Sequence, residues 1–147
     1  RLLVSSGSSS ILFSILPRLI QPKARVLMLR PTYSEYPHVL EHVIGCSAID
    51  VVDVTAQSFG NGRQVLKELN ERVMSGNYDG VFLVNPNSPT GTAFARSDLE
   101  ALACKMASKT PHTILWIDEC YMDYAVDALD VETMEPALSI NRNLFVC

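Results

Sequence analysis

Two stretches of the sequence decide the fold: VFLVNPNSPTG at residues 81–91 and ILWIDECY at residues 114–121. Each begins with four apolar residues, as a buried strand does, and continues into polar ones. In an open α/β sheet, ligands bind beyond the carboxyl ends of parallel strands. We therefore expect one site where these two strands end, and the lone carboxylate of Asp118 to need a partner there.

Strands and helices alternate through the rest of the chain. Apolar runs predict strands at residues 26–29, 48–54, 81–84, 113–117 and 143–147. Helical patterns begin near residue 11, cover 34–44 and about 66–75, and begin again at 97. Continuous apolar strands that alternate with helices indicate a parallel sheet covered on both faces. The predicted fold class is three-layer α/β, with a mainly parallel sheet and helices on both faces, in one domain.

Local signals place the ends of several helices. Pro17 is expected to kink or shorten the first helix, and Gly45 to close the second. The motif SDLE at residues 97–100 has the pattern of a capping box, with Ser97 as the N-cap. The helix that it opens carries apolar residues on one face: Leu99, Leu102, Ala103 and Met106.

Composition limits the class of protein. The 147 residues are 48% hydrophobic and 19% charged, which is typical of a folded domain with a core. The net charge of −4 argues against a nucleic-acid surface, and no apolar run approaches the length that spans a bilayer. The start, RLLVS, lacks Met and resembles the end of a strand, so we expect a fragment of a longer chain.

The four cysteines stand at positions 46, 104, 120 and 147. None forms the CxxC pair that zinc ribbons and thioredoxin-like redox sites require. We expect buried or half-buried free thiols in a reducing cytosol.

Polar and aromatic residues gather at the predicted strand and helix ends. Ser8 and Ser9, at a helix start, offer hydroxyl and backbone N–H groups suited to a phosphate, although an ordinary serine N-cap has the same pattern. Tyr33 offers a ring face to a planar ligand or is a core aromatic residue. Asp118 and Tyr121 place a carboxylate and a phenol at one strand end, unless Asp118 merely caps a turn.

Together these groups suit a phosphorylated, aromatic, cationic ring. Such a ring needs an anion site, a stacking surface, a carboxylate for a ring N–H⁺ and a polar group for a ring oxygen. Pyridoxal 5'-phosphate has these features, and its chemistry depends on a carboxylate partner for the pyridinium nitrogen. An ionised carboxylate favours the protonated form of that nitrogen.

Four segments resemble those of class I/II aminotransferases, which are fold-type-I enzymes that use pyridoxal phosphate. They are GSS at 7–9, PTYSEY at 31–36, NPNSPTG at 85–91 and DECY at 118–121, in the family's order. Within this family the sequence is most similar to the histidinol-phosphate aminotransferases and to the related threonine-phosphate decarboxylases.

The resemblance implies roles for the site residues. The serines would hold the cofactor phosphate, the first tyrosine would stack on the pyridine ring, the aspartate would pair with the ring nitrogen and the second tyrosine would hydrogen-bond the phenolic oxygen. In that order, these residues are Ser8 and Ser9, Tyr33, Asp118 and Tyr121.

The proline turn departs from the family at one position. An Asn that shares the phenolic oxygen usually stands just before Pro-Thr-Gly, where this sequence has Ser88. Either Ser88 replaces it, or Asn87 supplies the amide. The family also implies a cis peptide at Ser88–Pro89, which is affordable only before proline.

The family's Schiff-base lysine follows a strand similar to residues 143–147, and the chain stops before it. The resemblance therefore implies that residues 1–147 are an incomplete cofactor-binding large domain, without the lysine-bearing segment and the small domain, and inactive alone. The parent enzyme would be a cytoplasmic homodimer that transfers an amino group from a phosphorylated amino compound, such as histidinol phosphate, to a 2-oxo acid. The alternative on the same scaffold is decarboxylation of threonine phosphate.

Three other interpretations explain fewer residues. The motif HVLEH at 38–42 matches a zinc-peptidase pattern, with His38 and His42 on one helix face, but no third ligand is marked and no metal is expected. A non-catalytic α/β module that binds a phosphate-bearing ligand leaves Tyr33, Asp118 and Tyr121 to chance. A nicotinamide-dependent dehydrogenase lacks the glycine fingerprint.

Overall fold

A computed structural model describes residues 2–55, 62–125 and 131–147. In these ranges, five parallel strands form one sheet in the order β2-β1-β3-β4-β5. The strands are β1 (Arg25–Arg30), β2 (Ala48–Asp53), β3 (Gly80–Val84), β4 (Ile114–Asp118) and β5 (Leu144–Val146). Each strand end lies within one residue of the position that the apolar runs predict.

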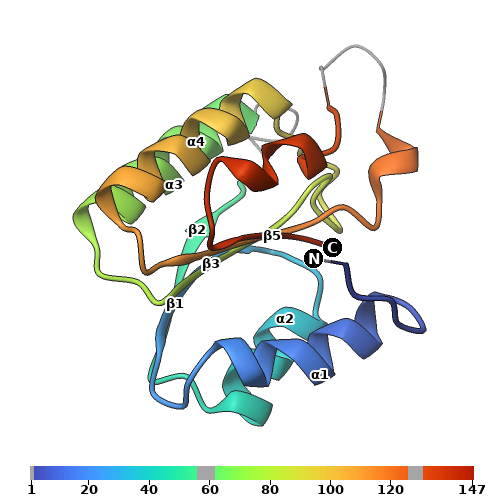
Figure 1. Cartoon of the computed structure of the whole chain (residues 1–147), viewed down its shortest axis with the longest axis vertical. Coiled ribbons are helices and arrows are strands. Elements are labelled where there is room, and N and C mark those ends of the chain that lie inside the picture. Colours follow the sequence, from blue (N-terminus) through green and yellow to red (C-terminus); the bar gives the residue numbers. More distant parts are fainter. Residues whose placement is uncertain (1, 56–61, 126–130) are drawn as a thin grey trace.

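Helices cover both faces of this sheet, so the predicted three-layer α/β fold is confirmed. Figure 1 shows α1 (Ser8–Leu19) and α2 (Glu35–His38) on one face, and α3 (Gly62–Ser75) and α4 (Arg96–Lys109) on the other. The shorter helical segments are η1 (Val39–Ile44), η3 (Met122–Tyr124) and η5 (Glu135–Ser139). None of the helices in the described ranges has the length and hydropathy that a membrane span needs.

Each strand contributes to two cores because successive side chains of a strand face opposite layers. In β3, Leu83 packs in the core under α3 and α4, whereas Phe82 and Val84 pack in the core under α1 and η1. Trp116 of β4 belongs to the second core. Asp118 is two residues further along β4, so its side chain faces the layer of α1 and α2.

Pro17 lies inside the first helix, α1, which continues past it to Leu19, so the proline does not end the helix at its own position. Leu12 and Leu16 are fully buried against the sheet, and this packing offsets the hydrogen bond that proline cannot donate. The second helical segment ends as predicted, with Gly45 in the left-handed conformation at φ 77°.

Two further expectations are corrected. Helix α4 begins one residue before the expected N-cap: Ala95 is the N-cap, and no side chain caps the helix. The apolar face of α4 is confirmed, since Leu99 and Met106 are fully buried. The first described residues do not end a strand, because no strand of the sheet pairs with them, and Leu2 and Val4 are 93% and 85% exposed.

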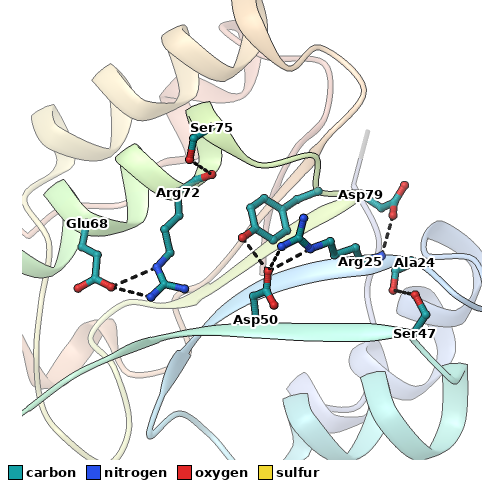
Figure 2. Close-up of polar contacts among 9 residues, drawn as sticks. Ala24, Arg25, Ser47, Asp50, Glu68, Arg72, Ser75 and Asp79 are labelled. Atoms are coloured by element: carbon teal, nitrogen blue, oxygen red, sulfur yellow. Dashed lines mark hydrogen bonds and ion pairs between the residues drawn. The ribbon is translucent and has the colours of Figure 1, made fainter.

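A polar cluster ties β1, β2 and the residues before β3 together near the amino-terminal end of the sheet (Figure 2). The Arg25 guanidinium contacts Asp50 Oδ2 at 2.5 Å and lies over the Tyr78 ring, 4.8 Å from its centroid. The Tyr78 hydroxyl also donates to Asp50 Oδ2, at 2.9 Å. This cluster lies at the opposite end of the strands from the site predicted at their carboxyl ends.

Candidate functional site

The loops that follow β1 and β3 are joined by the side chain of Asn87. Its Nδ2 donates to the Pro31 carbonyl at 3.0 Å and to Thr90 Oγ1 at 2.8 Å, and its Oδ1 accepts from Thr32 Oγ1 at 3.3 Å. Strands β1 and β3 are neighbours from which the chain continues in different directions, which is where ligands bind in such sheets. Asn87 therefore holds the two halves of the predicted site together.

The proline turn is closed by its own backbone. The Gly91 N–H donates to the Asn87 carbonyl at 2.7 Å, and the Asn87 N–H donates to the Thr92 carbonyl at 2.8 Å. Gly91 adopts φ 67°, a left-handed conformation in which other residues are strained. The peptide between Ser88 and Pro89 is cis, as predicted. This turn leaves Ser88 half-buried.

A cavity of about 250 Å³ lies beside this turn. Three predicted site residues line it, namely Asn87, Ser88 and Tyr121. The described part of its wall does not include the other predicted residues: Ser8, Ser9, Tyr33 and Asp118. The structure thus brings the turn and Tyr121 to one cavity, and connects the remaining residues to it through neighbours.

Tyr33 is one of these connections. Its ring lies edge-on to that of Tyr121, with centroids 6.5 Å apart and an angle of 82° between the planes. It contacts the ring of Tyr36 in the same manner, at 6.5 Å and 71°. Edge-to-face contacts at these distances are favourable aromatic pairs. Tyr33 therefore bridges the cavity wall and Tyr36.

Asp118 is the last residue of β4 and is fully buried. Its Oδ2 accepts a hydrogen bond of 2.7 Å from the Tyr36 hydroxyl, and its Oδ1 accepts one of 3.0 Å from the backbone N–H of Cys120. The Trp116 indole N–H donates in turn to the Tyr36 oxygen at 2.8 Å. A carboxylate has about four acceptor positions, so Asp118 can accept further donors.

Tyr36 and Trp116 are the residues that sequence reasoning missed. One signal could have found Trp116: it alternates with Asp118 along β4, so both side chains face the same layer. Tyr36 stands three residues after Tyr33 and is the second residue of α2. Nothing in the sequence pairs Tyr36 with Asp118.

The groups around Asp118 keep their protons. Burial, followed by the charge of Asp118, raises the pKa of Tyr36 well above its ordinary value. Burial, followed by the nearby Asp118 carboxylate, raises the pKa of the Cys120 thiol to about 12, and burial and the same charge raise that of Cys147 to about 11. At neutral pH all three groups are therefore uncharged.

Ser8 and Ser9 lie in the first turn of α1, where backbone N–H groups have no partner within the helix. Gly7 is the N-cap and no side chain caps the helix, so neither serine is an ordinary cap. The Ser9 hydroxyl donates to Glu35 Oε1 at 2.9 Å. Glu35 precedes Tyr36, which contacts Asp118, so the start of α1 and Asp118 lie on the same side of the molecule.

The cysteine thiols and the histidine side chains form neither a disulfide nor a metal site in the part of the chain that the structure describes. The four thiols are free, as predicted, but Cys104 and Cys120 are exposed rather than buried. Cys104 lies off the apolar face of α4, and Cys120 follows the end of β4. The rings of His38 and His42 are 5.4 Å apart, but the described residues contain no group of three His, Cys, Asp or Glu that could hold a metal ion.

A second cavity, of about 310 Å³, lies between α3 and α4. Arg63, Lys67, Asp98 and Lys105 contribute its charged groups. It faces the other layer of the molecule and contains none of the predicted site residues.

Comparison with known proteins identifies the family of the chain. The family of aminotransferases of class I and II matches residues 1–147. The chain belongs to this family. A threonine-phosphate decarboxylase from Sinorhizobium sp is 31% identical over 134 residues, covering 91% of this chain and 31% of that protein. A histidinol-phosphate aminotransferase from Geobacillus thermodenitrificans is 27% identical over 150 residues, covering 99% of this chain and 37% of that protein.

Solved structures show the same fold. The crystal structure of an aminotransferase from Mycobacterium tuberculosis superposes with a TM-score of 0.72 at 26% identity, covering 95% of this chain and 34% of that one. The chain thus spans about a third of the length of the family members that it matches.

Proposed function

We propose that this chain forms the cofactor-binding part of a pyridoxal-phosphate-dependent aminotransferase. The observation that supports this most is the fully buried Asp118 carboxylate, whose partners among the described residues are a hydroxyl and a backbone N–H but no cation. A buried charge without an oppositely charged partner is costly. A cationic ligand ring beside it would supply that partner.

The residues present fit this cofactor. When bound, pyridoxal phosphate supplies a ring that accepts electrons released at the substrate α-carbon. Asp118 would pair with the ring nitrogen, Tyr33 would stack on the ring, and Tyr121 would hydrogen-bond the ring oxygen. The free N–H groups at Ser8 and Ser9 would bind the phosphate.

The structure also favours Ser88 over Asn87 as the second partner of the ring oxygen. Both donor positions of the Asn87 amide are already used within the protein, by Pro31 and Thr90. Ser88 is half-buried and lines the cavity. We therefore propose that Asn87 shapes the turn and that Ser88 contacts the cofactor.

The names of the relatives support a proposal for the activity of the parent protein. We propose transfer of an amino group from a phosphorylated amino compound, histidinol phosphate being the best candidate, to a 2-oxo acid, by a homodimer in the cytoplasm. Decarboxylation of threonine phosphate is the second candidate, because a 31% identical relative carries that name. Residues 1–147 would be part of the large domain, with the lysine and the small domain supplied by other sequence, and would bind the cofactor without turnover.

Pyridoxamine 5'-phosphate tests the cofactor site, because it needs no lysine to bind. We expect saturable binding to the 147-residue chain, measured by calorimetry. D118N should weaken binding by at least about a hundredfold, since removing one partner of a buried charge pair typically costs about 3–5 kcal/mol. The matched control D123N removes the same charge at an exposed position and should leave the affinity unchanged. Absence of binding, or equal losses in both variants, would contradict the proposal.

The parent protein distinguishes the two reactions. With 2-oxoglutarate present, histidinol phosphate should yield glutamate if it is an aminotransferase. Release of CO₂ from threonine phosphate, with no glutamate formed from histidinol phosphate, would favour the decarboxylase instead.

A further inference from the structure

Three buried side chains form a continuous series of hydrogen bonds that ends at Asp118. Trp116, Tyr36 and Asp118 are 2%, 1% and 0% exposed. The indole N–H donates to the Tyr36 oxygen at 2.8 Å, and the Tyr36 hydroxyl donates to Asp118 Oδ2 at 2.7 Å. These residues come from β4 and α2, which are far apart in the sequence.

The direction of this series is set by its first member. An indole N–H can donate a hydrogen bond but cannot accept one. Trp116 therefore occupies an acceptor position of the Tyr36 oxygen, and the Tyr36 proton is left to point at Asp118. Burial and the charge of Asp118 raise the pKa of Tyr36, which keeps that proton in place.

We propose that Tyr36, oriented by Trp116, is a positioning residue that fixes the Asp118 carboxylate in place for the ring nitrogen of the cofactor. This inference rests on the proposed function. Two donors, Tyr36 and the Cys120 N–H, hold one oxygen each, so the carboxylate cannot rotate freely. The Tyr36 hydroxyl and the ring N–H⁺ would then share one carboxylate, so the strength of one hydrogen bond affects that of the other.

The hydroxyl can be separated from the packing of the ring. The Tyr36 ring lies 6.1 Å from that of Phe82 and belongs to the core under α1. Y36F keeps this ring and removes only the hydroxyl. Y78F is the matched control, because Tyr78 also donates to an aspartate, Asp50, at 2.9 Å near the other end of the sheet.

The first experiment needs no cofactor. Trp116 is the only tryptophan in the sequence, so its indole N–H gives a single, assignable NMR signal. The charge of Asp118 polarises the Tyr36 hydroxyl and strengthens the oxygen as an acceptor. We therefore expect D118N to move the indole proton to lower chemical shift, although Asp118 does not contact the indole N–H. An unchanged signal in D118N would overturn the proposal.

The second experiment uses bound pyridoxamine 5'-phosphate and follows its absorbance with pH. Y36F should raise the pKa of the bound ring nitrogen by about one unit, which is the scale of one hydrogen bond to a charged group. W116F, which keeps Tyr36 but removes the group that orients it, should produce a smaller rise, and Y78F none. W116F keeps the test decisive if Y36F does not fold.

The outcomes separate the two proposals. If pyridoxamine phosphate does not bind to the wild-type chain, the proposed function fails, and the indole signal alone decides whether Asp118 is coupled to Trp116. If it binds but Y36F and W116F leave the ring nitrogen unchanged, the cofactor site stands and Tyr36 has only a structural role.

Discussion

At the scale of single residues, Asp118 influences how readily its neighbours lose their protons. The Tyr36 hydroxyl and the Cys120 backbone N–H contact its carboxylate. Its negative charge also disfavours deprotonation of the nearby thiols, Cys120 and Cys147. Burial, and after it the charge of this carboxylate, thus makes a tyrosine and two cysteines less acidic than they are in water.

The reactivity of Cys120 tests this effect. The thiolate is the form that reacts with alkylating reagents, and the pKa of Cys120 is raised to about 12. Cys104 and Cys120 are both exposed, but at pH 8 we expect iodoacetamide to modify Cys120 at least about tenfold more slowly than Cys104, as measured by peptide mass spectrometry. D118N should accelerate modification of Cys120 and leave Cys104 unchanged. Equal rates for Cys120 in the two proteins would show that Asp118 does not control this thiol.

At the scale of secondary-structure elements, the start of α4 depends on which of its side chains are buried. The capping-box pattern of SDLE predicts a start at Ser97, but α4 starts at Arg96 with Ala95 as its N-cap. The N–H groups of Asp98 and Leu99 both donate to the Ala95 carbonyl at 3.1 Å. Leu99 and Met106 are fully buried, and Arg96 pairs with Glu100 one turn later, at 2.8 Å. Packing and this ion pair extend the helix beyond the predicted cap.

The absent cap predicts that Ser97 contributes little to stability. Replacing an N-cap serine with alanine usually costs about 1 kcal/mol. Because Ser97 lies inside the helix, we expect S97A to change the free energy of unfolding by less than about 0.5 kcal/mol, as measured by urea denaturation. L99A removes a fully buried side chain and should cost about 2–5 kcal/mol, which verifies the sensitivity of the measurement. If S97A lowers the free energy of unfolding by about 1 kcal/mol or more, Ser97 does act as the N-cap that the capping-box pattern predicts.

The two ends of the sheet have different roles at the scale of the whole molecule. The carboxyl ends of β1, β3 and β4 carry the candidate site. The opposite end carries the Arg25–Asp50–Tyr78 cluster (Figure 2), which joins neighbouring strands. The hydrogen bond from Tyr78 is the main cause that lowers the pKa of Asp50, and burial followed by Asp50 raises the pKa of Tyr78.

These opposite pKa shifts predict a range of pH in which the contact between Asp50 and Tyr78 stabilises the fold most. Asp50 has a lowered pKa in the folded state, so its contribution is present above its ordinary value of 3.8 and is lost as pH falls through the folded-state pKa. Tyr78 has a raised pKa, so its contribution is present below 10.0 and is lost as pH rises through the folded-state pKa. The difference in free energy of unfolding between the wild type and Y78F should therefore be largest between these limits.

Urea denaturation from pH 3 to pH 11 measures this difference. It should shrink toward both ends of the range. A difference that does not depend on pH would mean that Tyr78 stabilises the fold by packing alone.

Local patterns in the sequence determined where the strands lie and how several turns are built. Apolar runs located all five described strands because burial on both faces requires side chains of that kind in every position. Parallel strands share one edge for their carboxyl ends, which predicts that residues after β3 and β4 lie close together, and Ser88 and Tyr121 do line one cavity. The left-handed Gly45 and the cis peptide at Ser88–Pro89 were also predicted.

Only the tertiary structure decided which side chains meet. Tyr36 and Asp118 are 82 positions apart, and Thr32 and Asn87 are 55 apart. No local pattern specifies such pairs, because they depend on how α2 packs on the sheet and on how the loops after β1 and β3 meet. Buried polar groups form hydrogen bonds with the partners that packing brings within reach. In this fold, the partner of Asp118 is Tyr36, and the amide of Asn87 binds groups of the two loops.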